Sequence, residues 1–383
     1  MLEFRQVSLE IRRQPVLEQV SFTAREGEMV VLIGPSGCGK SSCLRMVNRL
    51  EEPTAGQVLL DGQDIRREDP VSLRRRIGYV TQRPGLFPHL TVEENLSLLP
   101  CLEGLPPGER QDRAARLVEE AGLPPEETLF RYPSQLAPVQ RQRVAVARAL
   151  AGDPELLLMD DPFAALDPIT RSQLQDRMIS FHARSRRTVL FVTHDMDEAI
   201  KIAGRICIMD RGRVLQYDTP ENILKYPADD FVREFVGRGR IWSSPQLIRA
   251  QDIMLTTPVT APGDMAFLRA VEVMRMSKVD SLMVVDGRHR LLGVVSVKAL
   301  GRRAQEGSPA QETATLAQLM DPSPPTCRPE ESIVSLLQRV NREELSTLPV
   351  VDDRGVLRGL ITKGSLVSTL SRRFLIQEGG TAQ

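Results

Sequence analysis

One stretch near the N-terminus strongly constrains the first elements of the fold. Residues 28–42 read EMVVLIGPSGCGKSS, an apolar run that leads directly into a glycine-rich loop. The loop Gly34–Ser41 fits the pattern G-x-x-x-x-G-K-[ST], and helix-forming residues follow it as far as Leu50. Glycines allow backbone N–H groups to converge on phosphate oxygens, and the N-terminus of the next helix adds positive potential. The sequence therefore predicts a buried strand, a phosphate-binding loop and a helix, at the start of an α/β domain.

Each polar group of this loop has a predicted task on a bound nucleotide. Lys40 is expected to reach the β- and γ-phosphates, and the Ser41 hydroxyl to bind Mg²⁺. The alternative is a plain glycine turn, but both the motif and its place between strand and helix favour a phosphate site. We predict ATP and Mg²⁺ as ligands, and the nucleotide-binding residues are Gly34, Pro35, Ser36, Gly37, Cys38, Gly39, Lys40, Ser41 and Ser42.

Polar residues follow three other apolar runs. Asp160 ends the run ELLLMD and suits the acid that holds Mg²⁺ through water, while Asp161 stands where an attacking water would be polarised. His194 follows LFVT and is placed to approach a γ-phosphate. A lone histidine at a strand end is usually just a satisfied polar group, but beside these acids a functional role is favoured. Gln82, after IGYVT, carries little information alone.

Composition excludes several classes of protein. The chain has 383 residues, enough for two or three domains, and its 50 basic and 50 acidic side chains balance, so no net charge draws it to nucleic acid. No apolar run is long enough to cross a membrane, and no signal peptide is expected at the N-terminus. The five cysteines lack the spacing of a disulfide framework or zinc site, which suits a reducing cytosol.

An internal repeat occupies the C-terminal part. SLMVVDGRHRLLGVVS begins at 281 and TLPVVDDRGVLRGLIT at 347, and the earlier pair IMLTTPVTAPGD and LMDPSPPTCRPE has the same offset of 66 residues. Each copy is too small to bury its own sheet, so the two are expected to pack together. The predicted divisions are an ATP-binding domain 1–237 with a helical insertion at about 98–150, a linker 238–250, repeats 251–310 and 317–375, and a tail 376–383.

These motifs together resemble the ATP-binding subunit of an ABC transporter. IGPSGCGKSS, IGYVTQRPGLFPHLTVEEN, LLLMDDPFAALDPITR and FVTHDMDEAIKIA match that family in order and spacing. With the tandem repeat, the chain resembles more narrowly the subunits of glycine betaine, carnitine and choline importers, which carry two C-terminal CBS domains. The likeness covers nearly the whole chain. It implies a P-loop ATPase domain, with a RecA-like core, an antiparallel β part and a helical insertion, followed by a tandem CBS module.

The resemblance also implies roles and partners. Gln82 becomes the Q-loop residue that senses Mg²⁺ and the membrane partner, and His194 the switch histidine. Catalytic residues are then Asp161, His194 and Gln82, and magnesium ligands Ser41, Gln82 and Asp160. The D-loop is Ala164, Ala165, Leu166 and Asp167. Expected partners are a second ATPase subunit, identical or paired, an integral-membrane permease and, indirectly, an extracytoplasmic solute-binding protein. The chain would sit peripherally on the cytoplasmic face of the inner membrane.

Three positions depart from the family pattern. Where the family reads L-S-G-G-Q, a loop that caps the ATP held by the opposite subunit, this chain has Leu136, Ala137, Pro138, Val139 and Gln140. The serine hydroxyl is gone, proline has no N–H, and valine is bulky where glycine allows close approach. Asp161 replaces a glutamate and is shorter by one methylene. Ile11 stands where the family offers an aromatic to stack on adenine, and Arg12 is a weak substitute.

These departures predict ATP binding with slow hydrolysis. A homodimer would carry both defects in both sites, and pairing with an intact partner would put one defect in each site. Two rivals stay open: a nucleotide-binding regulatory subunit with little turnover, and an ABC ATPase that serves no permease.

The CBS module resists a simple assignment. Ser296 and Thr362 keep the hydroxyl that grasps a ribose in the family, but Ala299 and Ser365 replace the aspartates three residues later. A nucleotide or ionic-strength signal and plain dimerisation both remain open. Four arginines are candidates for sensing salt or an anion, although such runs are more often solvated surface: Arg302, Arg303, Arg372 and Arg373.

Overall fold

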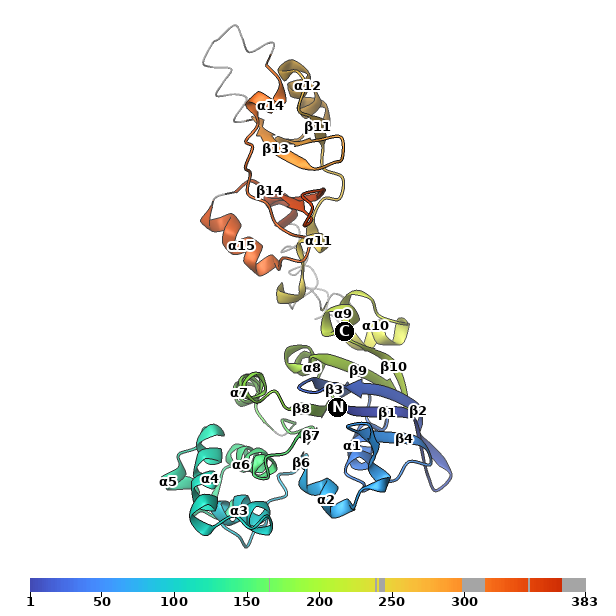
Figure 1. Cartoon of the computed structure of the whole chain (residues 1–383), viewed down its shortest axis with the longest axis vertical. Coiled ribbons are helices and arrows are strands. Elements are labelled where there is room, and N and C mark those ends of the chain that lie inside the picture. The colour runs from blue at the N-terminus through green and yellow to red at the C-terminus, as the bar shows by residue number, and fades with distance from the viewer. Residues whose placement is uncertain (165, 238–239, 241–244, 298–313, 344, 367–383) are drawn as a thin grey trace, which may run out of the picture. The chain divides into compact units, whose positions relative to one another are not determined.

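The computed structural model describes residues 1–164, 166–237, 240, 245–297, 314–343 and 345–366 (Figure 1). The chain divides into two compact units, Met1–Arg238 and Gly239–Gln383. The first unit is mixed α/β and the second contains two small sheets flanked by helices. This confirms the predicted fold class. Among the described residues, no helix has the length and apolar character that crossing a membrane requires.

A six-stranded sheet forms the centre of the first unit, in the order β10-β9-β3-β8-β7-β6. Neighbours from β9 to β6 are parallel, and β10 is antiparallel to β9. Four of the parallel strands are fully or almost fully buried, as parallel sheets covered on both faces require. The bounds are β3 (Met29–Ile33), β6 (Ile77–Val80), β7 (Leu156–Asp160), β8 (Thr188–Thr193), β9 (Arg205–Asp210) and β10 (Arg213–Asp218).

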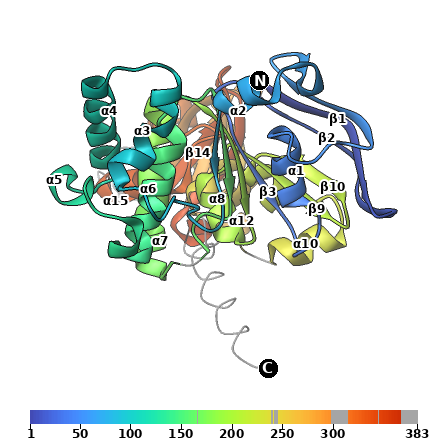
Figure 2. The ribbon, with the colours of Figure 1, turned by 90° about the horizontal axis from the view of Figure 1, so that it is seen from below.

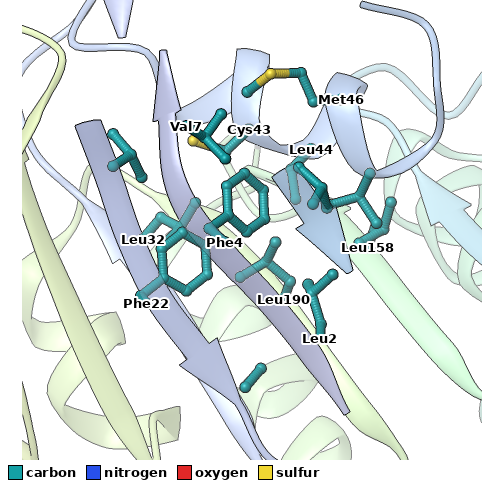
Figure 3. Close-up of a cluster of buried hydrophobic side chains, with 14 of the residues drawn as sticks. Leu2, Phe4, Val7, Phe22, Leu32, Cys43, Leu44, Met46, Leu158 and Leu190 are labelled. Carbon is teal, nitrogen blue, oxygen red and sulfur yellow. The ribbon is translucent and has the colours of Figure 1, made fainter. Parts of the chain in front are cut away.

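A second, antiparallel sheet covers one side of this core, in the order β2-β1-β4-β5. Its strands are β1 (Leu2–Ile11), β2 (Gln14–Ala24), β4 (Ala55–Leu60) and β5 (Gln63–Asp64). Phe4 and Phe22 stack between the layers with ring centroids 4.5 Å apart. Side chains of α1, such as Leu44, and of the central strands join the same buried cluster (Figure 3). This cluster holds rigid the strand and helix that flank the glycine loop.

Ten α-helices of the first unit are described, and one group of them stands apart. Helices α3 (Val92–Leu102), α4 (Pro107–Glu120), α5 (Pro125–Thr128) and α6 (Pro138–Leu150) gather at one end, opposite β1 and β2 (Figure 2). They share an apolar cluster of their own that includes Leu96, Val118 and Val144. The others are α1 (Lys40–Val47), α2 (Pro70–Arg75), α7 (Pro168–Ser185), α8 (Met196–Ile202), α9 (Pro220–Lys225) and α10 (Asp230–Val236).

The second unit contains two copies of one pattern. The first copy has α11 (Ala250–Ile253), β11 (Thr260–Pro262), α12 (Phe267–Ser277), β12 (Ser281–Val285) and β13 (Leu291–Ser296). The second has α14 (Leu316–Leu319), α15 (Ile333–Arg342), β14 (Thr347–Val351) and β15 (Leu357–Thr362). The helices α11 and α14, α12 and α15, and both strand pairs begin 66 residues apart, which is the offset seen in the sequence.

The two copies exchange their first helices. Arg249, before α11, bridges to Ser332 of the second copy, and Thr315, before α14, bridges to Ala266 of the first. A second pair of bridges, Leu255 to Leu360 and Val294 to Asp321, obeys the same symmetry. The copies therefore pack around an internal pseudo-twofold axis. Each sheet lacks enough apolar cover by itself, and a shared cluster that includes Met283, Leu357 and Leu360 supplies it.

Candidate nucleotide site

The glycine loop lies where the sequence places it, between β3 and α1. Gly34 lies so close to β9 that a Cβ there would be 2.0 Å from the backbone oxygen of Met209. Gly39, the N-cap residue directly before α1, has a φ of 101°, a conformation that favours glycine. The first backbone N–H groups of a helix have no partner within it, so this end of α1 offers donors to an anion. The geometry suits close approach of a phosphate chain.

Lys40 and Ser41 are held beside the acid at the end of β7. The Lys40 ammonium is almost wholly buried and donates to the carbonyl oxygens of Gly34 at 2.7 Å and Pro35 at 2.8 Å. The Ser41 hydroxyl donates to Asp160 Oδ1 at 2.9 Å. Burial raises the pKa of Asp160, the Ser41 hydrogen bond opposes that rise, and the charge of Asp161 adds to it. Hydroxyl and carboxylate oxygens are ligands that Mg²⁺ prefers, so this pair fits the predicted metal.

Asp161 and His194 are also brought together. Asp161 Oδ2 and His194 Nδ1 are 2.9 Å apart, and the imidazole is 62% exposed. The backbone of Asp161 is in the left-handed region, with a φ of 46°, and its N–H donates to Val192 of the neighbouring strand β8. Aspartate tolerates this conformation better than most side chains do. The carboxylate is thus fixed at the edge of the sheet, beside an imidazole that faces solvent.

Gln82 lies at the same edge, and among the described residues no hydrogen bond joins its side chain to these groups. It is exposed and stands two residues after β6, whose Val80 pairs in register with Met159 of β7. That register puts Gln82 level with the two acids. The carboxyl ends of neighbouring parallel strands meet at one edge of the sheet, which explains why the sequence reasoning grouped these residues.

The altered loop is a well-formed helix start. Pro138 is the first residue of α6, and Gln140 Oε1 accepts the backbone N–H of Ala137 at 2.9 Å. Ala137 and Pro138 are exposed, whereas Leu136 is buried in the helical cluster. Proline suits this position because the first N–H of a helix needs no internal partner. The structure does not bring this loop to the phosphate-binding loop of its own chain.

Two arginines that the sequence did not reveal connect neighbouring segments at the carboxyl edge of the six-stranded sheet. Arg171 of α7 forms an ion pair with Asp195 at 3.2 Å and donates to the carbonyl of Leu166 at 3.2 Å. Asp195 also caps α8, directly after His194. Arg171 therefore joins the predicted D-loop to the switch segment. Of the four D-loop positions, Ala165 lies outside the described residues, and Asp167 caps α7.

Arg148 of α6 likewise connects two segments, here near Gln82 in the sequence. Its guanidinium donates to the carbonyl of Gly85 at 2.8 Å and lies over the Phe87 ring, 5.8 Å from the centroid. It links the helix that follows the altered loop to the segment after Gln82. Neither arginine stands out in the sequence, because nothing in the spacing reveals which carbonyl a long side chain reaches.

The turn after β1, where the resemblance predicts an adenine-stacking residue, is exposed. Ile11 ends β1 and is 43% exposed, and Arg12 and Arg13 form the left-handed turn into β2. No aromatic ring occupies this turn, as the sequence indicates.

In the second unit, Thr362 exchanges hydrogen bonds with Ser365, whose N–H donates to Thr362 Oγ1 at 3.1 Å. Ser365, which stands at the position of the family's aspartate, thus bonds the Thr362 hydroxyl. Ala299, Arg302, Arg303, Arg372 and Arg373 lie outside the described residues.

Comparison with known proteins identifies the families to which the two units are similar. The family profile described as "ABC transporter" matches residues 17–164, and that for the CBS domain matches 250–304 and 316–372. The glycine betaine/carnitine/choline transport ATP-binding protein OpuCA of Bacillus subtilis is 40% identical over 96% of this chain and 95% of its own. The glycine betaine/proline betaine ATP-binding protein ProV of Escherichia coli is 36% identical over 93% and 88%.

The first unit also matches solved structures. The ATP-binding cassette MJ0796, solved as a dimer in a post-hydrolysis state with ADP and Pi, aligns with a TM-score of 0.53 at 33% identity. The match covers 57% of this chain and 99% of that one.

Proposed function

Because the chain belongs to the family of ABC transporter ATP-binding subunits with paired CBS domains, we propose that it powers import of a quaternary-amine osmoprotectant. Candidate solutes are glycine betaine, carnitine and choline, which appear in the names of relatives such as OpuCA. The observation that carries the proposal is similarity over nearly the full length of both chains, with the nucleotide machinery intact at the glycine loop. As an ABC-type ATPase, the chain handles nucleotide and not solute. A cage for a quaternary ammonium needs several aromatics, and the sequence has one Trp and four Tyr.

The described residues divide the work of nucleotide binding. Lys40 would exchange its hydrogen bonds to the carbonyl oxygens of Gly34 and Pro35 for phosphate oxygens, to which the backbone N–H groups of residues 36–42 would also donate. Ser41, Asp160 and Gln82 would hold magnesium, which would supply neutralisation of the phosphate charge. Asp161 would polarise the attacking water, and His194, oriented by its contact with Asp161, would approach the γ-phosphate.

We further propose that turnover is slow. The loop at residues 136–140 offers no serine hydroxyl, and Pro138 removes one backbone donor at the start of α6. Each hydrogen bond to a charged group is worth about 1.5–3 kcal/mol. The Asp161 carboxylate is withdrawn by on the order of 1 Å relative to glutamate, and such a displacement can cost about 100-fold in rate.

The same loop favours a second candidate, a nucleotide-binding regulatory subunit that dimerises with little turnover. In that case, restoring the serine and both glycines would still leave hydrolysis negligible.

The remaining assignments follow from the family. The chain pairs with a second ATPase subunit and docks on an integral-membrane permease at the cytoplasmic face of the membrane, and a solute-binding protein acts outside. The domain limits 1–237, 251–310 and 317–375 are those proposed from the sequence, and the CBS module carries a regulatory signal. Its ribose site is weakened, because Ser365 occupies the aspartate position and bonds Thr362.

Transport and copurification test this proposal together. A tagged chain is expressed together with candidate permease subunits from the same organism, and uptake of labelled choline and glycine betaine is measured. Copurification with a permease, and uptake that Lys40→Ala abolishes, are expected. Failure to recover any membrane partner, with uptake indifferent to Lys40→Ala, would favour an ABC ATPase that serves no permease.

A further inference from the structure

A buried carboxylate lies between α8 and α7, shortly after His194 in the sequence. Glu198, in the first turn of α8, is only 3% exposed, and its Oε1 accepts a hydrogen bond from Gln175 Nε2 of α7 at 3.0 Å. Gln175 is buried as well. Helix α8 begins directly after the segment that carries His194, and α7 begins directly after the D-loop. This hydrogen bond therefore joins the helices that follow the predicted switch segment and D-loop.

The residues on both sides of His194 are tied to this carboxylate. Asp195 Oδ1 accepts the backbone N–H of Glu198 at 3.2 Å, and the N–H of Asp195 donates to Thr193 Oγ1 at 3.1 Å. Thr193 is wholly buried, and its side chain also hydrogen-bonds the Glu198 carboxylate. A hydroxyl can accept one hydrogen bond and donate another, so Thr193 accepts from Asp195 and donates to Glu198. The contacts of the backbone on either side of His194 thus converge on Glu198.

An acid at this position costs stability. Burial raises the pKa of Glu198, and the hydrogen bonds from Thr193 and Gln175 oppose that rise. The charges of Asp195 and Asp161 raise it further. Among the described residues, no lysine, arginine or histidine forms an ion pair with Glu198. A buried carboxylate without a cation is expensive, and an apolar side chain would pack α8 against α7 at lower cost. Helix packing alone therefore does not account for this glutamate.

We propose that Glu198 is a positioning residue for ATP hydrolysis, which fixes the backbone that carries His194 and links it through Gln175 to α7. The imidazole of His194 is 62% exposed, so apart from its contact with Asp161 little packing holds it. Its place at the edge of the sheet then depends on the backbone on either side, which Glu198 holds. This inference rests on the role proposed above for His194.

Hydrolysis and binding of labelled ATP, measured on the same full-length samples, test this role. Glu198→Leu fills the same space without an acceptor. It should slow hydrolysis by about 10- to 100-fold, because a displacement of His194 on the order of 1 Å has such an effect. ATP affinity should change by less than about twofold. Glu198→Gln can still hydrogen-bond both neighbours and should stay within about threefold of the wild-type rate.

Asp176→Ala is the matched control. Asp176 is an exposed carboxylate of α7 that pairs with Lys201 of α8 at 2.8 Å, so it joins the same two helices at the surface. Exposed ion pairs contribute little, and this variant should change neither the rate nor the affinity. Thermal unfolding reports whether each variant is folded, and Glu198→Ala replaces Glu198→Leu if leucine prevents folding.

A double variant shows whether Glu198 acts through His194. In that case His194→Ala, and His194→Ala combined with Glu198→Leu, should hydrolyse ATP at the same reduced rate. Additive losses, or a wild-type rate in Glu198→Leu beside a slow His194→Ala, would overturn this proposal alone. A wild-type rate in His194→Ala would overturn both this proposal and the role proposed for His194.

NMR of the imidazole signals reports the position of His194 without turnover. The chain has four histidines, and His194→Ala identifies which signal belongs to His194. Asp161→Asn should shift this signal, because it alters the hydrogen-bond partner of the ring, and Glu198→Leu should shift it as well. Asp176→Ala and Glu198→Gln should leave it in place. An unmoved signal in folded Glu198→Leu would refute the positioning role.

Discussion

Two loops of the first unit lead into helices. One keeps the residues of its family motif, and the other has lost them. The loop before α1 keeps its glycines, and its lysine and serine already meet the carbonyls and the carboxylate that position them. The loop before α6 has exchanged serine and both glycines for alanine, proline and valine, yet its helix still begins at Pro138. A helix needs only a suitable first turn, whereas a phosphate needs free donors and room for the backbone to approach. Fold and ligand contact can therefore diverge within one segment.

The largest expected effect tests the intact loop. Lys40→Ala should weaken ATP binding by a factor of roughly several hundred, because at least two hydrogen bonds to a charged group are lost at about 1.5–3 kcal/mol each. Equilibrium binding of a fluorescent ATP analogue measures this. Lys201→Ala removes the same charge from the surface of α8 and should bind normally. Equal affinity in the two variants would mean that phosphate is held elsewhere.

A second effect concerns the acid beside the histidine. Asp161→Glu alone should raise the hydrolysis rate by about 100-fold with little change in ATP affinity, because the carboxylate moves on the order of 1 Å toward the water. A small loss of thermal stability should accompany it, since position 161 has a φ of 46°, where aspartate is better tolerated than glutamate. A rate unchanged in steady-state assays would show that carboxylate reach is not limiting.

A third effect tests the close approach at the intact loop. Gly34→Ala should destabilise the first unit by about 1–3 kcal/mol, because the added Cβ meets the backbone oxygen of Met209. Gly108→Ala, where a Cβ would meet nothing within 4 Å, is the matched control. Thermal unfolding compares them, and an unaltered midpoint for Gly34→Ala would show that the loop relaxes freely.

The smallest effect is a pH dependence at Asp160. Its pKa in the folded chain lies above the ordinary value of 3.8, so its ionised form costs stability at every pH above that raised pKa. Asp160→Asn should therefore melt slightly higher than the wild type at pH 7, while Mg-ATP binds more weakly. The stability advantage should shrink as the pH falls through the raised pKa. An advantage that persists at low pH would assign the stability difference to packing.

The sequence predicted much of this molecule because its signals are local. A strand, a glycine loop and a helix in succession identify Lys40 and Ser41, and the 66-residue offset locates every matching element of the second unit. The contacts of Arg148 and Arg171, and the exchange of α11 and α14 between repeats, were not predictable. They depend on which part of the backbone, distant in sequence, a side chain or helix contacts. The periodicity of apolar residues in the sequence carries no information about that. The role of Gln82 came from the resemblance, that of His194 from its strand-end position and the resemblance together, and both stay predictions.

The central claim, a firm hold on ATP with slow turnover, is tested most directly by measuring affinity and hydrolysis on the same protein samples. The wild type is compared with a variant that combines Ala137→Ser, Pro138→Gly, Val139→Gly and Asp161→Glu. We expect both proteins to bind ATP with similar affinity and the restored one to hydrolyse it at least about 100-fold faster. A restored protein that is no faster, or a wild type that fails to bind ATP with magnesium, would contradict the account.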